Sequence, residues 1–196
     1  ISCTKLYEAL GATHENIIML DSKGVITSDR EKLDETKRYF ATDRRDIHTL
    51  EEAIKDADVF LGLSKGNVLT QDMVRSMASH PIVFALANPV PEISYEDAMA
   101  ARPDVLMSTG RSDYPNQINN VVAFPGIFKG ALAVRASDIN EEMKRAAAYA
   151  IAGVVSEDKL CADFILPNAF DKNIATVVAE AVAEAAVKSG VARIQK

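Results

Sequence analysis

Four short runs of hydrophobic residues alternate with segments that carry hydrophobic residues at helical spacing. Runs without a polar face are typical of strands that are buried on both sides of a sheet. Three of the four helical segments begin near a Ser or Thr, the residues that helix N-termini prefer. The runs are Ile17–Leu20, Val59–Leu61, Ile82–Leu86 and Val105–Met107, and the helices are about Glu31–Phe40, Thr49–Lys55, Thr70–Met77 and Ser94–Ala101. This alternation predicts an α/β fold with a doubly wound parallel sheet.

Both ends of the chain are predicted to be helical. Residues Ile1–Leu10 indicate a helix that runs into Gly11, a residue suited to a helix C-cap. A doubly wound nucleotide-binding domain opens with a strand, a glycine-rich turn and a helix, so we expect the first strand and its turn to be missing. Additional C-terminal helices, rich in Ala and Val, are expected at Phe128–Val134, Glu141–Val155 and Asn173–Ser189. Nothing marks a second domain, and residues 1–196 are predicted to form one.

Composition narrows the class of protein. The 196 residues are 48% hydrophobic and 26% charged, as in globular proteins, and the net charge is −6 with scattered basic residues, which argues against nucleic acid. No run of about 18 apolar residues and no signal-peptide pattern is present, so no membrane association is expected. Cys3 and Cys161 form no CxxC pair, which argues against a zinc site or a disulfide framework. A cytoplasmic protein is expected.

Asp21, Ser22 and Lys23 follow the first hydrophobic run and precede Gly24. In a Rossmann-like domain, an acidic residue after the second strand binds the adenosine ribose hydroxyls, about 20 residues beyond the glycine turn. We therefore predict that these three residues bind a dinucleotide, although Asp, Ser and Gly are equally typical of an ordinary turn. Asp21 would repel the 2′-phosphate of NADP, whereas Lys23 could compensate that charge, so NAD and NADP both stay open.

Two more candidate residues follow the next two hydrophobic runs. Ligands of open α/β sheets bind beyond the carboxyl ends of the strands, and an Asn amide both donates and accepts hydrogen bonds. Asn88 is therefore predicted to bind cofactor or substrate; the alternative is that it caps the turn before Pro89. Ser64 is predicted to lie near a cofactor ribose or phosphate, with a plain connecting loop as the alternative. Glu92 is expected to be structural.

A polar segment, Ser108–Asn120, follows the fourth run and leads into an apolar stretch that contains Phe124-Pro125-Gly126. So many polar side chains at one strand end indicate a loop that binds a ligand. A tight turn with an Arg111 ion pair would give a similar pattern. No residue in the chain carries the sequence signature of a general base.

Three stretches together resemble the malic enzymes of the bacterial type, and the resemblance runs from Ile1 to about Lys188. They are Ile18–Ile26, Phe84–Ile93 and Thr109–Phe128. In that family malate is oxidised by hydride transfer to NAD(P), the β-keto acid loses carbon dioxide while Mg²⁺ or Mn²⁺ stabilises the enolate as a Lewis acid, and pyruvate is formed. The resemblance implies that this chain is the NAD(P)-binding domain of such an enzyme.

The resemblance also implies roles for individual residues. Asn88 matches the family's Asn-Pro-x-Pro-Glu stretch, and Asn120 matches the second asparagine of the pair before Phe-Pro-Gly. Both would contact malate or the nicotinamide end of the cofactor, with Asn119 as a further candidate, and Asp21 would hold the adenosine ribose. Amides suit this task because they bind a carboxylate or carboxamide without adding charge.

Several parts of the family's machinery have no counterpart in the chain. The catalytic Tyr and Lys, the three acidic metal ligands and the glycine turn all lie upstream of Ile1 in the family. We therefore expect no catalytic or metal-binding residue here, little turnover by the chain alone, and a homodimer or higher homo-oligomer. The alternatives are another NAD-dependent hydroxy-acid or amino-acid dehydrogenase, or a catalytically silent nucleotide-binding or assembly module.

Overall fold

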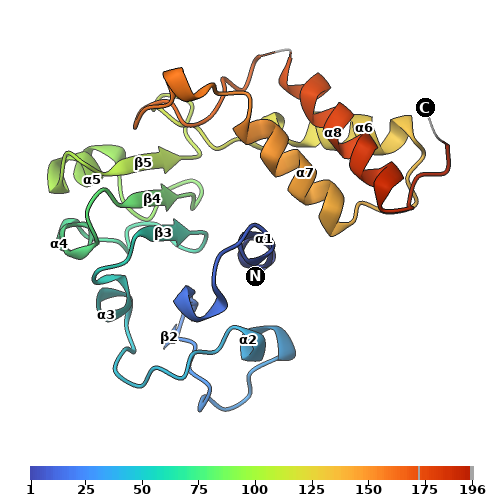
Figure 1. Cartoon of the computed structure of the whole chain (residues 1–196). Helices are drawn as coiled ribbons and strands as arrows, with labels where there is room; N and C mark the ends of the chain where they lie inside the picture. Colours follow the sequence, from blue (N-terminus) through green and yellow to red (C-terminus); the bar gives the residue numbers. More distant parts are fainter. Residues whose placement is uncertain (172, 195–196) are drawn as a thin grey trace.

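The computed structural model describes residues 1–171 and 173–194, and Figure 1 shows two halves. The first half holds a parallel sheet, and the second is a group of helices. Each half has its own cluster of buried hydrophobic residues. Among the described residues, no helix has both the length and the apolar character that crossing a membrane requires.

The parallel sheet confirms three of the four predicted strands. Strands β3 (Val59–Gly62), β4 (Ile82–Ala85) and β5 (Leu106–Thr109) lie in the order β3-β4-β5. They are aligned so that Ile82 pairs with Val59 on one side and with Leu106 on the other. Because all three strands are parallel, their carboxyl ends lie at one edge of the sheet, on the side where α1 (Ser2–Ala9) and α7 (Glu141–Ala152) lie in Figure 1.

Three short helices that the sequence predicted pack beside these strands: the first precedes β3, and the other two connect β3 to β4 and β4 to β5. They are α3 (Leu50–Ile54), α4 (Gln71–Ser76) and α5 (Tyr95–Ala101), and the N-cap side chains of Thr49, Thr70 and Ser94 accept hydrogen bonds from the first turn of each. The core between sheet and helices contains Ile54, Val74, Val83, Ala98 and Met107. These apolar contacts fix where each strand ends.

The predicted strand Ile17–Leu20 is wrong as a member of the parallel sheet. The chain instead forms a separate antiparallel pair, β1 (Leu20–Asp21) and β2 (Gly24–Val25), after the short helix η1 (His14–Asn16). A tight turn at Gly24 is the physical reason: its φ is +100°, and a Cβ there would lie 2.2 Å from the carbonyl oxygen of His48. The backbone of this run therefore pairs locally.

The predicted helix Glu31–Phe40 is shorter in the structure, where α2 covers Glu35–Tyr39. Lys32 has a left-handed φ of +57°, which a helix cannot contain. Asp34 then caps α2, because its side chain accepts a hydrogen bond from the Lys37 amide at 2.8 Å.

The helical half contains η2 (Asn120–Val122), α6 (Phe124–Ala133), α7, η3 (Glu157–Lys159) and α8 (Ile174–Lys188). Helix α6 begins four residues earlier than the predicted Phe128, since Pro125 stands in its first turn, where no amide hydrogen is needed. Gly126 and Gly130 let α6 approach α8 closely, because a Cβ at either position would overlap Val178 or Ala179. This packing fixes the position of α6, which begins shortly after Asn120.

Candidate functional site

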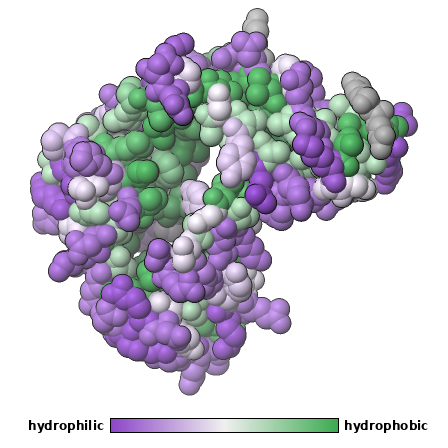
Figure 2. Space-filling model, viewed as in Figure 1, coloured by the Kyte–Doolittle hydropathy of each residue, from purple (hydrophilic) through white to green (hydrophobic). Residues whose placement is uncertain are grey.

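The carboxyl edge of the parallel sheet brings together most of the residues that the sequence singled out. Ser64 lies two residues beyond β3, and Asn88 lies three residues beyond β4. Asn119 and Asn120 end the loop that follows β5. Figure 2 shows the molecule hollowed between the sheet half and the helical half, with hydrophobic residues along the sheet side.

Each of these polar residues stands next to an exposed hydrophobic side chain. Leu63 is 56% exposed beside Ser64, Val90 is 45% exposed two residues after Asn88, and Val121 is 46% exposed beside Asn120. Large hydrophobic side chains are normally buried, and ligand sites combine apolar surface with a few polar groups. The edge therefore has the composition of a site for a ligand with both apolar rings and polar substituents.

The side chains of Asn88 and Asn120 are available to a ligand. Both residues are exposed. Within the described residues, neither side chain makes a hydrogen bond, so the structure does not support the alternative that Asn88 caps the turn before Pro89. Asn119 differs, because its Oδ1 accepts a hydrogen bond from the Val121 amide at 3.0 Å and caps η2.

Glu92 joins the loops that carry Ser64 and Asn88. Its Oε1 accepts a hydrogen bond from the Ser64 amide at 3.0 Å, and its Oε2 accepts one from the Ala87 amide at 3.0 Å. The residue has no exposed surface. Gly62 leaves room for it, since a Cβ there would lie 2.3 Å from the Glu92 carboxyl carbon. The predicted structural role of Glu92 is confirmed.

The loop between β5 and Asn120 is held from two sides. Asn116 is 7% exposed; its Nδ2 donates to the carbonyl oxygens of Met107, at 3.3 Å, and Ala162, at 2.7 Å, while its Oδ1 accepts from the Ile165 amide at 2.9 Å. On the other side, the ring of Tyr114 stacks on Tyr95 of α5 with centroids 4.7 Å apart. The loop that ends at Asn120 is thus preorganised.

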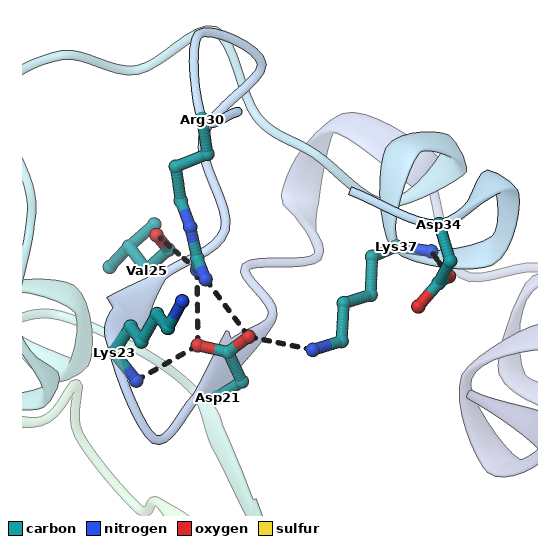
Figure 3. Close-up of polar contacts among 6 residues, drawn as sticks. All are labelled: Asp21, Lys23, Val25, Arg30, Asp34 and Lys37. Atoms are coloured by element: carbon teal, nitrogen blue, oxygen red, sulfur yellow. Dashed lines mark hydrogen bonds and ion pairs between the residues drawn. The ribbon is translucent and has the colours of Figure 1, made fainter. Parts of the chain in front are cut away.

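Asp21 ends β1, and Ser22 and Lys23 form the turn that leads to β2, outside the parallel sheet. Figure 3 shows that Arg30 and Lys37 both point at the Asp21 carboxylate. Arg30 donates through Nη1 at 3.1 Å and Nη2 at 3.0 Å, and Lys37 Nζ donates at 2.8 Å. The Lys23 amide donates to Asp21 Oδ1 at 2.9 Å. Such a bond is typical of a turn that begins at an Asp, so the ordinary turn that the sequence left open as an alternative is also present.

These cations change the electrostatics of Asp21. The hydrogen bonds from Arg30, and then from Lys37, hold the pKa of the Asp21 carboxyl well below its usual range. A hollow of about 390 Å³ lies beside it. Its charged lining consists of Lys23, Arg30, Lys32 and Lys37 against Asp21, Glu31 and Asp34. The arrangement offers a carboxylate to ribose hydroxyls and an excess of cations to a phosphate.

Within residues 1–171 and 173–194, no three His, Cys, Asp or Glu side chains are grouped so that they could hold a metal ion. A second hollow of about 250 Å³ lies at the starts of α4 and α5. Two of its polar residues, Thr70 and Ser94, already cap these helices.

Sequence reasoning missed Arg30, Lys37 and Asn116. Arg30 and Lys37 lie 9 and 16 residues beyond Asp21, and no helical or strand periodicity connects them to it. Asn116 stood in the polar segment that the sequence marked, but its burial depends on residues 162 and 165, which lie far along the chain. The lysine and arginine content after Asp21 was the only available signal.

The chain is similar to several malic enzymes. The family model described as "Malic enzyme, NAD binding domain" matches residues 7–187. A bifunctional malic/malolactic enzyme of Bacillus subtilis is 53% identical over an alignment of 199 positions, which covers 99% of this chain and 48% of that protein. An NADP-dependent malic enzyme of Haemophilus influenzae is 50% identical over an alignment of 207 positions, which covers 98% of this chain and 27% of that protein.

A solved structure shows the same arrangement of elements. The crystal structure of Entamoeba histolytica malic enzyme has a TM-score of 0.92 and 38% sequence identity, and the match covers 100% of this chain and 42% of that one. The chain thus spans between about a quarter and a half of the length of these relatives.

Proposed function

The chain belongs to the malic enzyme family, where it corresponds to the NAD-binding domain, and on that premise we propose that it supplies the NAD(P) site of an enzyme that oxidises and decarboxylates malate to pyruvate. The observation that carries this proposal is the carboxyl edge of the parallel sheet, where Ser64, Asn88 and Asn120 stand beside exposed apolar side chains. That edge is where open α/β sheets bind their ligands.

Asp21 is proposed to hold the adenosine ribose, with Ser22 and Lys23 beside it. Its carboxylate accepts hydrogen bonds, which suits ribose hydroxyls, and Arg30 and Lys37 balance its charge. With these cations in place the carboxylate is a weak barrier to a 2′-phosphate. We therefore propose that the site accepts NADP as well as NAD, and that Lys37 contributes to NADP binding.

Asn88 and Asn120 are proposed to orient malate against the nicotinamide ring, with Ser64 near the ribose or phosphate of the cofactor. A neutral amide can donate to a carboxylate of malate or accept from the carboxamide of nicotinamide without adding charge. When NAD(P) is bound it takes up the hydride from malate. The chain's own residues contribute binding and orientation, which lower the entropic part of the barrier.

The remaining chemistry is proposed to come from the part of the protein outside this chain. Mg²⁺ or Mn²⁺ would act as a Lewis acid on the keto acid, with ligands from that part. We also propose a cytoplasmic homodimer or higher homo-oligomer. The cytoplasm would keep the exposed Cys3 and Cys161 reduced, and the exposed side chains of Phe124, Phe128 and Leu132 on α6 would suit an interface.

Substitution of the two asparagines in the full-length protein tests this assignment. Asn88→Ala and Asn120→Ala each remove an amide that binds a charged group, a loss of about 1.5–3 kcal/mol, so kcat/KM for malate should fall by about 10- to 150-fold. Asn16→Ala, an exposed asparagine in η1, is the control and should change it by less than about threefold. Unchanged malate kinetics in both variants would refute the assigned roles.

A further inference from the structure

The carboxylate of Glu92 is fully buried where the loops after β3 and β4 meet. Burying a charged carboxylate is costly unless both of its oxygens accept hydrogen bonds. The two donors here are the backbone amides of Ser64 and Ala87, one from each loop. A hydrocarbon side chain could fill the same space, but it could not bond to either amide.

The two loops are joined around this carboxylate along their whole length. The Leu86 amide donates to the Gly62 carbonyl oxygen at 3.1 Å, before the loops diverge. Further along, the Asn67 amide donates to the Pro91 carbonyl oxygen, and the Leu69 amide donates to the Glu92 carbonyl oxygen, each at 3.0 Å. Between these backbone bonds, the Glu92 side chain links the two loops by accepting hydrogen bonds from the amides of Ser64 and Ala87.

Close packing leaves little freedom for another arrangement. A Cβ on Gly62 would lie 2.3 Å from the Glu92 carboxyl carbon, and a Cβ on Gly66 would lie 2.7 Å from the Val90 carbonyl oxygen. Both glycines therefore let the loop after β3 approach the loop after β4. The loops form one unit, and its polar centre is the Glu92 carboxylate.

We propose that Glu92 is a positioning residue for the dinucleotide: by fixing both loops before the ligand arrives, its carboxylate sets the affinity of the Ser64 and Asn88 loops for NAD(P) without touching it. This inference rests on the proposed function of those loops. Binding to a preorganised site avoids the cost of ordering the loops. Loss of the carboxylate should therefore weaken dinucleotide binding.

Glu92→Gln in the full-length enzyme isolates this effect, because Gln has nearly the same shape but turns an NH₂ group toward one of the two amides. The KM for NADP and the Kd for NADPH, measured by its fluorescence, should rise by at least about tenfold, while kcat at saturating NADP stays within about threefold. Glu180→Gln, an exposed carboxylate on α8, is the matched control and should leave both constants unchanged.

The KM and kcat effects separate positioning from a merely structural role. A substitution that only unfolds part of the enzyme lowers the apparent kcat and leaves the KM of the folded fraction unchanged, and this outcome overturns the proposal. If the wild-type enzyme itself neither binds NADPH nor reduces NADP, the proposed function fails as well. If the wild-type enzyme binds NADPH and reduces NADP, and Glu92→Gln has the same KM and Kd, then only the role proposed for Glu92 is refuted.

Hydrogen exchange on the wild-type enzyme provides a test that does not depend on a variant that folds. The amides of Ser64 and Ala87 should be protected from exchange before any dinucleotide is added, because Glu92 already accepts from both. Rapid exchange of these amides that slows only when NADPH is bound would show that the ligand orders the loops, and would contradict the proposal.

Discussion

Asn116→Asp should destabilise the chain strongly although it changes only one atom of the side chain. The Asn116 Nδ2 donates to the carbonyl oxygens of Met107 and Ala162, and an Asp oxygen in its place would face both acceptors. The bond from the Ile165 amide to Oδ1 can persist. Each carbonyl left without a donor in a buried or partly buried position costs about 1–3 kcal/mol, so the expected loss for the two is about 2–6 kcal/mol at pH 7.

Asn67→Asp is a control with almost the same backbone. Asn67 has a φ of +59° and Asn116 a φ of +53°, and both Asn and Asp adopt this left-handed region more readily than other side chains. Asn67 is exposed, so its substitution should change the free energy of unfolding by less than about 0.5 kcal/mol. Comparison of the two variants therefore separates the hydrogen bonds of Asn116 from backbone preference.

Urea denaturation followed by far-UV circular dichroism measures both variants against the wild type. Burial should raise the pKa of the introduced Asp, and its protonated form can donate to one carbonyl. The deficit of Asn116→Asp relative to wild type should therefore be smaller at pH 5 than at pH 7. A loss below about 1 kcal/mol at pH 7, or an equal loss in Asn67→Asp, would refute the role given to these hydrogen bonds.

Three further predictions concern packing, the cofactor and pH. Gly130→Ala places a Cβ 2.4 Å from the Ala179 carbonyl oxygen. The overlap costs about 1–3 kcal/mol against a gain of about 1 kcal/mol in helix propensity, so urea denaturation should show a net loss of stability. Gly110→Ala is the control and should show no such loss, because its Cβ meets nothing within 4 Å. Lys37→Gln should lower kcat/KM for NADP by about 5- to 30-fold and change that for NAD by less than about threefold, because the partly exposed cation would bind only the 2′-phosphate; equal losses with both cofactors would contradict this. Arg102 holds the pKa of Asp104 below its usual range, so the folded state binds fewer protons than the unfolded state, and the stability this pair contributes should be present above about pH 4 and lost as the pH falls further. Asp104→Asn should flatten the fall of the thermal midpoint in that acid range, and an unchanged slope would argue against the pair.

The sequence predicted the parallel strands well because their signal is local. β4 is a run of apolar residues between a proline and a polar loop, and such a run in a chain of this kind has few other places to be buried. The caps at Thr49, Thr70 and Ser94 are equally local, since each depends on residues within one turn. Elements that depend on short-range chemistry were therefore found at nearly their observed bounds.

The features that the sequence did not predict depend on contacts between distant residues. The run Ile17–Leu20 is as hydrophobic as a sheet strand, but the turn at Gly24 pairs its end with β2 instead. The cations around Asp21 come from positions that only the folded loop brings near it. Asn88 was predicted from its place after a hydrophobic run and Asn120 through the family resemblance, whereas the buried links made by Glu92 and Asn116 required the structure.

Malate-dependent reduction of NADP and of NAD by the full-length protein with Mn²⁺ tests the central claim most directly. We predict that the dinucleotide is reduced only when malate is present, and that pyruvate and carbon dioxide form in equal amounts. A folded, full-length protein that binds NADPH but reduces neither cofactor with malate would contradict the proposed function, and would leave the domain as a dinucleotide-binding module without this activity.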